Sequence, residues 1–162
     1  MSTRPSVPLL GALLKHRTDG RWAVPATPSG DIPLLYDMAM KQILDVGNCG
    51  PDHGALKRFF TKHFDCEVSQ ADRADDALAK LKQHPFDLVV VNRKLDIDYS
   101  DGIDVIKQIK STPELGEIPV MLITNFPEHQ QAAQAIGAIQ GFGKLELDAA
   151  DTVERVRAVL EP

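Results

Sequence analysis

The sequence is organised around the stretch Asp87-Leu88-Val89-Val90-Val91-Asn92. An unbroken run of four apolar residues, three of them β-branched, is typical of a strand that is buried on both faces of a sheet. Sheets built from such strands are usually parallel and are covered by helices on both sides. Their ligands and chemistry lie at the carboxyl ends of the strands. Asn92, at the end of this stretch, is therefore the first candidate functional residue.

Short apolar stretches alternate with helical patterns on both sides of residues 87–92. Five strand–helix repeats predict a flavodoxin-like (βα)5 three-layer α/β sandwich, with a five-stranded parallel sheet in the order 2-1-3-4-5. Asp101 is expected to cap the third helix, and Asp52 to cap the first. The expected strands are 43–46, 66–69, 88–91, 118–124 and 140–143, and the expected helices run from Asp52 and over 74–81, 103–109, 128–136 and 148–160.

Residues 1–38 differ in composition from the rest of the chain. They contain five prolines, which are typical of loops and linkers. They also contain apolar residues such as Trp22 and Leu34, more than a free linker needs. We therefore expect an N-terminal extension over 1–38, partly flexible or packed as an arm on the domain or on a second copy, followed by one domain over 39–162.

Composition and charge indicate a soluble globular protein. Of the 162 residues, 43% are hydrophobic and 25% are charged, and the formal net charge is −5. An acidic chain is not expected to bind nucleic acid through a basic face. Cys49 and Cys66 lack the spacing of metal ligands and are typical of reduced cytosolic thiols. Because no apolar run approaches the roughly 18 residues of a membrane helix, we expect a cytoplasmic protein without a membrane partner.

Two polar features do not fit the apolar pattern. Asp45 is the one charged residue in the stretch 43–46, and His53 follows Cys49 closely. Cys49, His53 and His63 offer no clear third ligand on a shared helical face. We therefore expect His53 to be a surface residue near a helix start, not part of a metal or nucleophilic cluster.

The segment from about residue 40 to residue 160 resembles the receiver domain of bacterial response regulators. The resemblance depends on the order and spacing of several motifs. They are Phe86-Asp87-Leu88-Val89-Val90-Val91, Ser100-Asp101-Gly102-Ile103-Asp104-Val105-Ile106, Ile118-Pro119-Val120-Met121-Leu122-Ile123-Thr124, Gly137-Ala138 and Lys144. The resemblance implies an acidic pair that binds Mg²⁺ after the first strand and a phosphoryl-accepting aspartate after the third. It also implies a hydroxyl after the fourth strand, and after the fifth a lysine preceded by an aromatic switch residue.

This sequence keeps only part of that set. Thr124 and Lys144 match the hydroxyl and the lysine. An amide cannot form an acyl phosphate, and it is a poor metal ligand beside a carboxylate. We therefore predict a pseudo-receiver without catalytic residues or cofactor, which acts through protein–protein interaction in two-component or phosphorelay signalling. The positions that lack the expected side chain are Gly47 and Asn48 for the acidic pair, Asn92 for the phosphoacceptor and Gly141 for the switch aromatic.

Two alternatives remain open at this point. The loop after Asn92 contains Asp96 and Asp98, and either carboxylate, displaced from the usual position, would with Mg²⁺ give a phosphoryl-accepting receiver. One of these two carboxylates is also the expected partner of Lys144. The other alternative is a small-ligand sensor at the C-terminal edge of the sheet.

A surface for a protein partner is also expected. The resemblance implies that the face formed by the fourth helix, the fifth strand and the last helix dimerises or binds partners. Phe142, Leu145 and Leu147 lie near this face in the sequence and are expected to contribute to it. A signalling protein, or a second copy bound through this face or through the N-terminal arm, is the predicted partner.

Overall fold

The computed structural model describes residues 17–18, 21–22 and 39–162. The chain forms two compact units, Met1–Ala39 and Met40–Pro162. In the first unit β1 (Arg17–Thr18) pairs in antiparallel orientation with β2 (Arg21–Trp22). The rest of the predicted extension over 1–38 lies outside the described residues. The second unit contains the large sheet.

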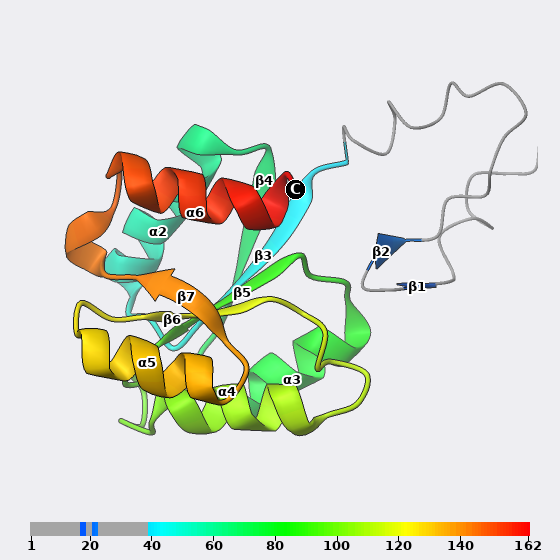
Figure 1. The fold of residues 1–162 in the computed structure, drawn as a ribbon. Coiled ribbons are helices and arrows are strands. Elements are labelled where there is room, and N and C mark those ends of the chain that lie inside the picture. The colour runs from blue at the N-terminus through cyan, green and yellow to red at the C-terminus, as the bar shows by residue number, and fades with distance from the viewer. Residues whose placement is uncertain (1–16, 19–20, 23–38) are drawn as a thin grey trace, which may run out of the picture. The chain divides into compact units, whose positions relative to one another are not determined.

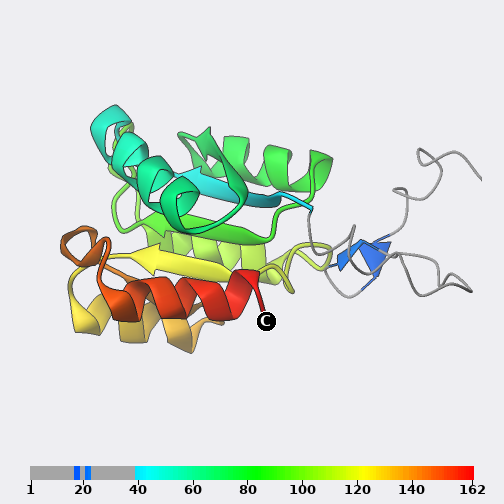
Figure 2. The same cartoon turned by 90° about the horizontal axis from the view of Figure 1, so that it is seen from above.

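Five parallel strands form the sheet of the second unit. They are β3 (Lys41–Val46), β4 (Cys66–Ala71), β5 (Leu88–Asn92), β6 (Val120–Ile123) and β7 (Ile139–Phe142). Their order across the sheet is β4-β3-β5-β6-β7, which is 2-1-3-4-5 when the five are numbered along the chain. Figure 2 shows the common direction of the central strands. The predicted flavodoxin-like topology is confirmed.

Helices cover both faces of this sheet. Figure 1 shows α2 and α6 on one face and α3, α4 and α5 on the other. In the described part of the chain, no helix is long and apolar enough to cross a membrane. The helices are α2 (Gly50–His63), α3 (Ala74–Gln83), α4 (Gly102–Ser111), α5 (Pro127–Ala135) and α6 (Ala150–Leu160), with a short 3-10 turn η2 (Lys144–Glu146) before α6.

Strand β5 lies at the centre of both cores. Val89 and Val91 pack with α3, α4 and α5, whereas Leu88 and Val90 pack with α2 and α6. All four side chains are 0% exposed. Each such burial stabilises the fold by about 1.5–3 kcal/mol. Burial on two faces is the reason why this strand is an unbroken apolar run and does not alternate with polar residues.

Two helix starts differ from the prediction. Helix α2 begins at Gly50 with Cys49 as its N-cap, so the expected cap Asp52 lies instead in the first turn. Pro51 favours this earlier start because its ring fixes the backbone and its missing N–H is not needed there. Helix α6 begins at Ala150 and not at residue 148. Asp148 has φ 68°, a left-handed conformation that a right-handed helix cannot contain.

Candidate functional site at the carboxyl edge of the sheet

Asn92 ends β5, and its amide holds two loops together. The Nδ2 atom donates hydrogen bonds to the carbonyl oxygen of Lys94, at 2.7 Å, and to that of Gly47, at 3.3 Å. These acceptors belong to the loops that follow β5 and β3. A carboxylate has no N–H to donate, so an aspartate here would face two carbonyl oxygens. The geometry around residue 92 is therefore suited to an amide.

Three of the predicted site residues share one pocket. Asn92, Thr124 and Lys144 line a pocket of about 170 Å³, together with Arg93 and Phe126 among others. Thr124 is 8% exposed, and its hydroxyl accepts a hydrogen bond from the backbone N–H of Phe126. The side chains that line this pocket include two lysine or arginine neighbours of Asn92 but no carboxylate. The pocket thus lacks both the phosphoacceptor and the metal ligands that the resemblance implies.

Lys144 is paired with a carboxylate that the sequence did not indicate. Its Nζ atom lies 2.5 Å from Oδ2 of Asp52, in the first turn of α2. The expected pairing with Asp96 or Asp98 is wrong. Asp98 instead accepts hydrogen bonds from the hydroxyl and the backbone N–H of Ser100. The hydrogen bond from Lys144 holds the pKa of Asp52 below its ordinary value.

Replacing Lys144 with methionine tests this pair. The pKa of Asp52 should rise toward its ordinary value. Because the pKa of Asp52 is lowered in the folded state, its ionised form stabilises the fold at pH values above the unfolded-state pKa. This contribution is lost as the pH falls through the folded-state pKa. The two side chains are 31% and 38% exposed, so we expect a loss below about 1 kcal/mol near neutral pH.

An NMR titration of the Asp52 carboxyl carbon measures that pKa directly. Lys62→Met, which removes an exposed partner of Asp148, is the matched control and should leave the Asp52 titration unchanged. An unaltered Asp52 pKa in Lys144→Met would contradict the assignment of this ion pair.

The two positions expected for the acidic pair are occupied by residues that make local structural contacts. Gly47 has φ +79°, and a Cβ there would lie 2.4 Å from Cγ of Leu95. Its carbonyl oxygen accepts a hydrogen bond from the backbone N–H of Asp96 at 2.9 Å. Asn48 is 3% exposed, and its Nδ2 donates to Asp45 at 2.6 Å. Neither residue presents a negative charge to the pocket around Asn92.

Asp45 and His53 form a buried pair that the sequence analysis missed. Asp45 is 0% exposed, on the face of β3 that α2 covers, and its Oδ2 lies 2.7 Å from Nδ1 of His53. Burial raises the pKa of Asp45, and the hydrogen bonds with Asn48 and His53 oppose this rise. The His53 side chain is only 18% exposed, so the expected surface position is wrong. The sequence could have indicated this pair through Asp45, because a carboxylate in a buried strand requires a hydrogen-bond partner.

Gly141 lies at an irregularity in the pairing of β6 with β7. Its N–H donates to Oε1 of Gln130 at 2.9 Å, and its carbonyl oxygen accepts from Arg155 at 2.8 Å. The Gln130 amide also donates to the carbonyl oxygen of Leu122 at 3.0 Å. A Cβ on Gly141 would lie 2.1 Å from that same oxygen. The side chains of Gln130 and Arg155 therefore bond to the backbone of Gly141, the position where a switch aromatic is expected.

The acidic loop after β5 is organised by local hydrogen bonds. Asp101 accepts from the backbone N–H of Ile103 at 3.0 Å, which confirms it as the N-cap of α4. Within residues 39–162 and the two short strands, no three acidic, histidine or cysteine side chains are grouped so that they could hold a metal ion.

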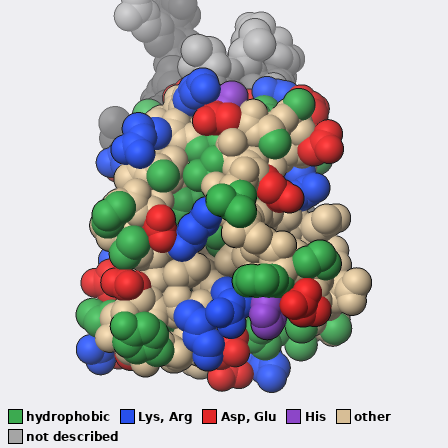
Figure 3. Space-filling view, turned by 90° about the vertical axis from the view of Figure 1, so that its left-hand side faces the viewer, with side chains coloured by type: hydrophobic (Ala, Val, Ile, Leu, Met, Phe, Trp, Pro, Cys, Tyr) green, Lys and Arg blue, Asp and Glu red, His purple; other side chains and the backbone are tan. Residues whose placement is uncertain are grey.

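The predicted contact residues differ in exposure. Phe142 is 1% exposed and packs in the core against Phe59, so its assignment to a contact surface is wrong. Leu147 is partly buried against the same core. Leu145 is 87% exposed. Figure 3 views the end of the domain where the strands finish, with separate hydrophobic patches among charged side chains. The large exposed apolar side chains of the loops after β5, β6 and β7 are Ile97, Tyr99, Phe126 and Leu145.

Fold and site together define an α/β domain with polar loops at the carboxyl edge of a parallel sheet, and comparison with known proteins gives the family. Residues 53–144 match the response regulator receiver domain. The chain is 31% identical over 95 residues to chemotaxis protein CheY-3 of Vibrio cholerae, covering 58% of this chain and 72% of that protein. The protein belongs to the response regulator receiver domain family.

Solved structures share the fold at lower identity. The signal receiver domain of a DNA-binding response regulator from Colwellia psychrerythraea superposes with a TM-score of 0.64 at 23% identity, covering 75% of this chain and 99% of that one. A CheY-like receiver domain from Methylobacillus flagellatus gives 0.63 at 16% identity, covering 76% of this chain and 100% of that one. Both place residues of the second unit in the same architecture.

Proposed function

We propose that this receiver domain is not phosphorylated and acts through protein–protein contacts in two-component or phosphorelay-type signalling. The observation that carries the proposal is the pocket around Asn92, Thr124 and Lys144, which no carboxylate lines. An acyl phosphate requires a carboxylate, and Mg²⁺ requires oxygen ligands that are usually charged. The Asn92 amide is already used in two hydrogen bonds to backbone carbonyl groups.

The lysine that matches the family's phosphate-contacting position supports the same proposal. Phosphoryl transfer depends on positive charge that neutralises the transferred group. Lys144 is the residue that matches this role, and it forms an ion pair with Asp52. Gly47 and Asn48 supply no charged ligand for a metal ion that would take over this role. A phosphoryl group in this pocket would therefore compete with Asp52 for Lys144.

A partner surface follows from the loops around the pocket. Tyr99 is 77% exposed, Phe126 53% and Leu145 87%. Aromatic and large aliphatic side chains that are exposed in this way are typical anchors of protein interfaces. They belong to the loops after β5, β6 and β7, so one partner that approaches the carboxyl edge of the sheet would contact all three loops. We propose that a signalling protein or a second copy of this chain binds here.

The decisive experiment is incubation of the full chain with acetyl phosphate and Mg²⁺, followed by intact mass spectrometry. A receiver with an aspartate phosphoacceptor serves as the positive control. We expect no added phosphoryl mass. A phosphoryl adduct that hydroxylamine removes would overturn the proposal, and peptide mapping to Asp96 or Asp98 would establish the displaced-carboxylate alternative.

Asn92→Asp extends this test. Restoring the carboxylate should not restore phosphorylation, because the metal ligands are still missing and Lys144 is still paired. The variant loses the two hydrogen bonds that Nδ2 donates, so we expect a loss of about 1–3 kcal/mol in unfolding free energy, measured by urea denaturation.

Asn125→Asp is the matched control for that variant. Asn125 lines the same pocket, and its Oδ1 accepts a hydrogen bond from the Leu145 N–H, which a carboxylate oxygen also accepts. Its stability should therefore stay near that of the unmodified protein. Efficient phosphorylation of Asn92→Asp would show that the site still holds the machinery and needs only its acceptor.

A further inference from the structure

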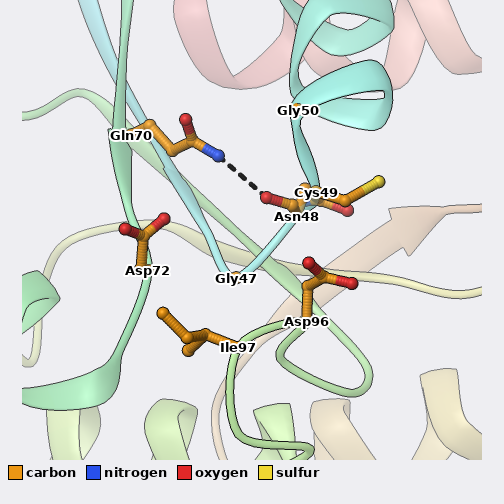
Figure 4. A pocket seen from close by; sticks show the side chains of 8 residues that line it. All are labelled: Gly47, Asn48, Cys49, Gly50, Gln70, Asp72, Asp96 and Ile97. Carbon is orange, nitrogen blue, oxygen red and sulfur yellow. Dashed lines mark hydrogen bonds between the residues drawn. The ribbon is translucent and has the colours of Figure 1, made fainter.

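The carboxyl edge of the sheet carries negative charge on the side of β3 and β4. A pocket of about 240 Å³ there is lined by Asp72 and Asp96, and by no lysine, arginine or histidine. Asp72 follows the end of β4 and Asp96 lies in the loop after β5, and Figure 4 shows them on opposite sides of the pocket, with Ile97 below. Both carboxylates are exposed, and neither forms an ion pair with another described residue. We call this region the acidic half of the edge.

The other side of the same edge, at β5 and β6, carries positive charge. The pocket around Asn92 is lined by Arg93, Lys94 and Lys144, and by no carboxylate. Lys144 is paired with Asp52, whereas Arg93 and Lys94 form no ion pair in the part of the chain that the structure describes. Because β5 lies between β3 and β6 in the sheet, the two pockets lie on opposite sides of the end of β5. We call this second region the basic half of the edge.

Each half also exposes a large apolar side chain. Ile97 lines the acidic half and is 50% exposed, and Phe126 lines the basic half and is 53% exposed. Tyr99 lies on the loop between them and has φ 58°, a left-handed conformation that is uncommon for a tyrosine. Its N–H donates to the carbonyl oxygen of Leu95 at 2.8 Å, which holds the loop in this shape. The loop therefore presents an exposed aromatic side chain from a fixed backbone, which lowers the entropy lost when a partner binds.

We propose that the carboxyl edge binds a second copy of this chain across a twofold axis, with the acidic half of each copy against the basic half of the other. This inference rests on the proposed function, because it names the partner of the surface described there. A twofold interface uses the same surface on both copies, so that surface must complement itself. Adjacent halves of opposite charge meet this requirement, because a twofold rotation about the line between them places each half on its opposite. A carboxylate of the second copy would then supply the negative charge that the basic half lacks.

Sedimentation velocity of the full chain over a range of concentrations tests this dimer. We expect the unmodified protein to self-associate, and added NaCl to weaken the association because salt screens exposed charges. An acid-reversed variant, Asp72→Lys with Asp96→Lys, and a base-reversed variant, Arg93→Glu with Lys94→Glu, should each associate roughly tenfold more weakly or worse, because like charges then face each other. An equimolar mixture of the two variants should recover the association, since every charge contact in the mixed dimer again joins opposite signs.

Glu114→Lys with Glu117→Lys is the matched control for the acid-reversed variant. It changes the net charge by the same amount, but both residues are exposed in the segment before β6, at the opposite end of the strands. Its association should equal that of the unmodified protein. Circular dichroism checks that each variant is folded. If a double variant is unfolded, Lys94→Glu and Asp96→Lys are compared and mixed in the same way, because both of these side chains are exposed.

Three outcomes would overturn the proposal. The first is a full chain that stays monomeric at every concentration. The second is an association that both reversals leave unchanged, which would place the interface on another face. The third is a mixture that associates no better than either variant alone. A phosphoryl adduct in the acetyl phosphate experiment would overturn the proposed function and would leave these sedimentation results as they are, so the two proposals fail separately.

Discussion

Replacing Gly141 with tyrosine is expected to lower the free energy of unfolding by about 3 kcal/mol or more. A Cβ at this position would lie 2.1 Å from the carbonyl oxygen of Leu122 and 3.0 Å from its carbonyl carbon and its nitrogen. These are backbone atoms of β6, a central strand, so they cannot move aside as a side-chain tip can. Relief of the clash requires β7 to separate from β6, with loss of the hydrogen bonds that Gln130 and Arg155 make to Gly141.

Urea denaturation measures this loss, with Gly54→Ala as the control. Gly54 lies inside α2, and a Cβ there would meet only the flexible end of Arg58, at 3.4 Å. Alanine should stabilise that helix by about 0.5–1 kcal/mol. A Gly141→Tyr variant as stable as the unmodified protein would show that β7 opens readily and still accommodates a switch aromatic. The proposal of a domain without that switch would then lose one of its supports.

The hydrogen bonds around Gly141 indicate how this part of the domain is held. Gln130 lies on α5 and Arg155 on α6, and both bond to the same glycine of β7. Helix, strand and helix are thus connected through one backbone position. In a switchable receiver the resemblance implies an aromatic that moves at this place. Here the hydrogen bonds of Gln130 and Arg155 to Gly141 would have to break before any such movement.

The fold was predictable because it depends on local pattern. The apolar run over 88–91 is buried on both faces, and such runs separated by helical patterns define a parallel sheet with its order. The placement of Asn92, Thr124 and Lys144 at one edge follows from the same pattern, because parallel strands all end there. Their polar partners were not predictable in this way.

The partners depend on distances between elements that the sequence does not contain. Lys144 pairs with Asp52 because α2 starts two residues before Asp52, which places this carboxylate beside the lysine. The irregular register that requires Gly141 arises from the pairing of β6 with β7 and is not indicated by the residues next to Gly141 in the sequence. Asp45 is different, because a carboxylate within a buried strand already requires hydrogen-bond partners. His53, one turn into the next helix, was a candidate for the partner of Asp45.

Replacing His53 with alanine is expected to destabilise the fold by roughly 3 kcal/mol near neutral pH, since it removes one partner of a buried charge. The folded pKa of Asp45 is already raised above its ordinary value of 3.8 by burial. A raised pKa means that the stabilising contribution is fully present below the unfolded pKa and is lost as the pH rises through the folded pKa. Without His53 the pKa of Asp45 should rise further. The cost of the substitution should therefore be small near about pH 4 and grow toward neutral pH.

Urea denaturation of His53→Ala at acid and neutral pH, each compared with the unmodified protein, measures this difference and cancels the titration of all other carboxyl groups. Asp45→Asn provides the control, because an amide can still accept from Asn48 and has no charge to bury. In the Asp45→Asn background, His53→Ala should cost less and should lose its dependence on pH. If the cost of His53→Ala is the same at both pH values, the interaction is one of packing and not of charge. In that case the buried pair would stabilise the turn between β3 and α2 only through packing. The position of Asn48 would then not depend on a charged Asp45.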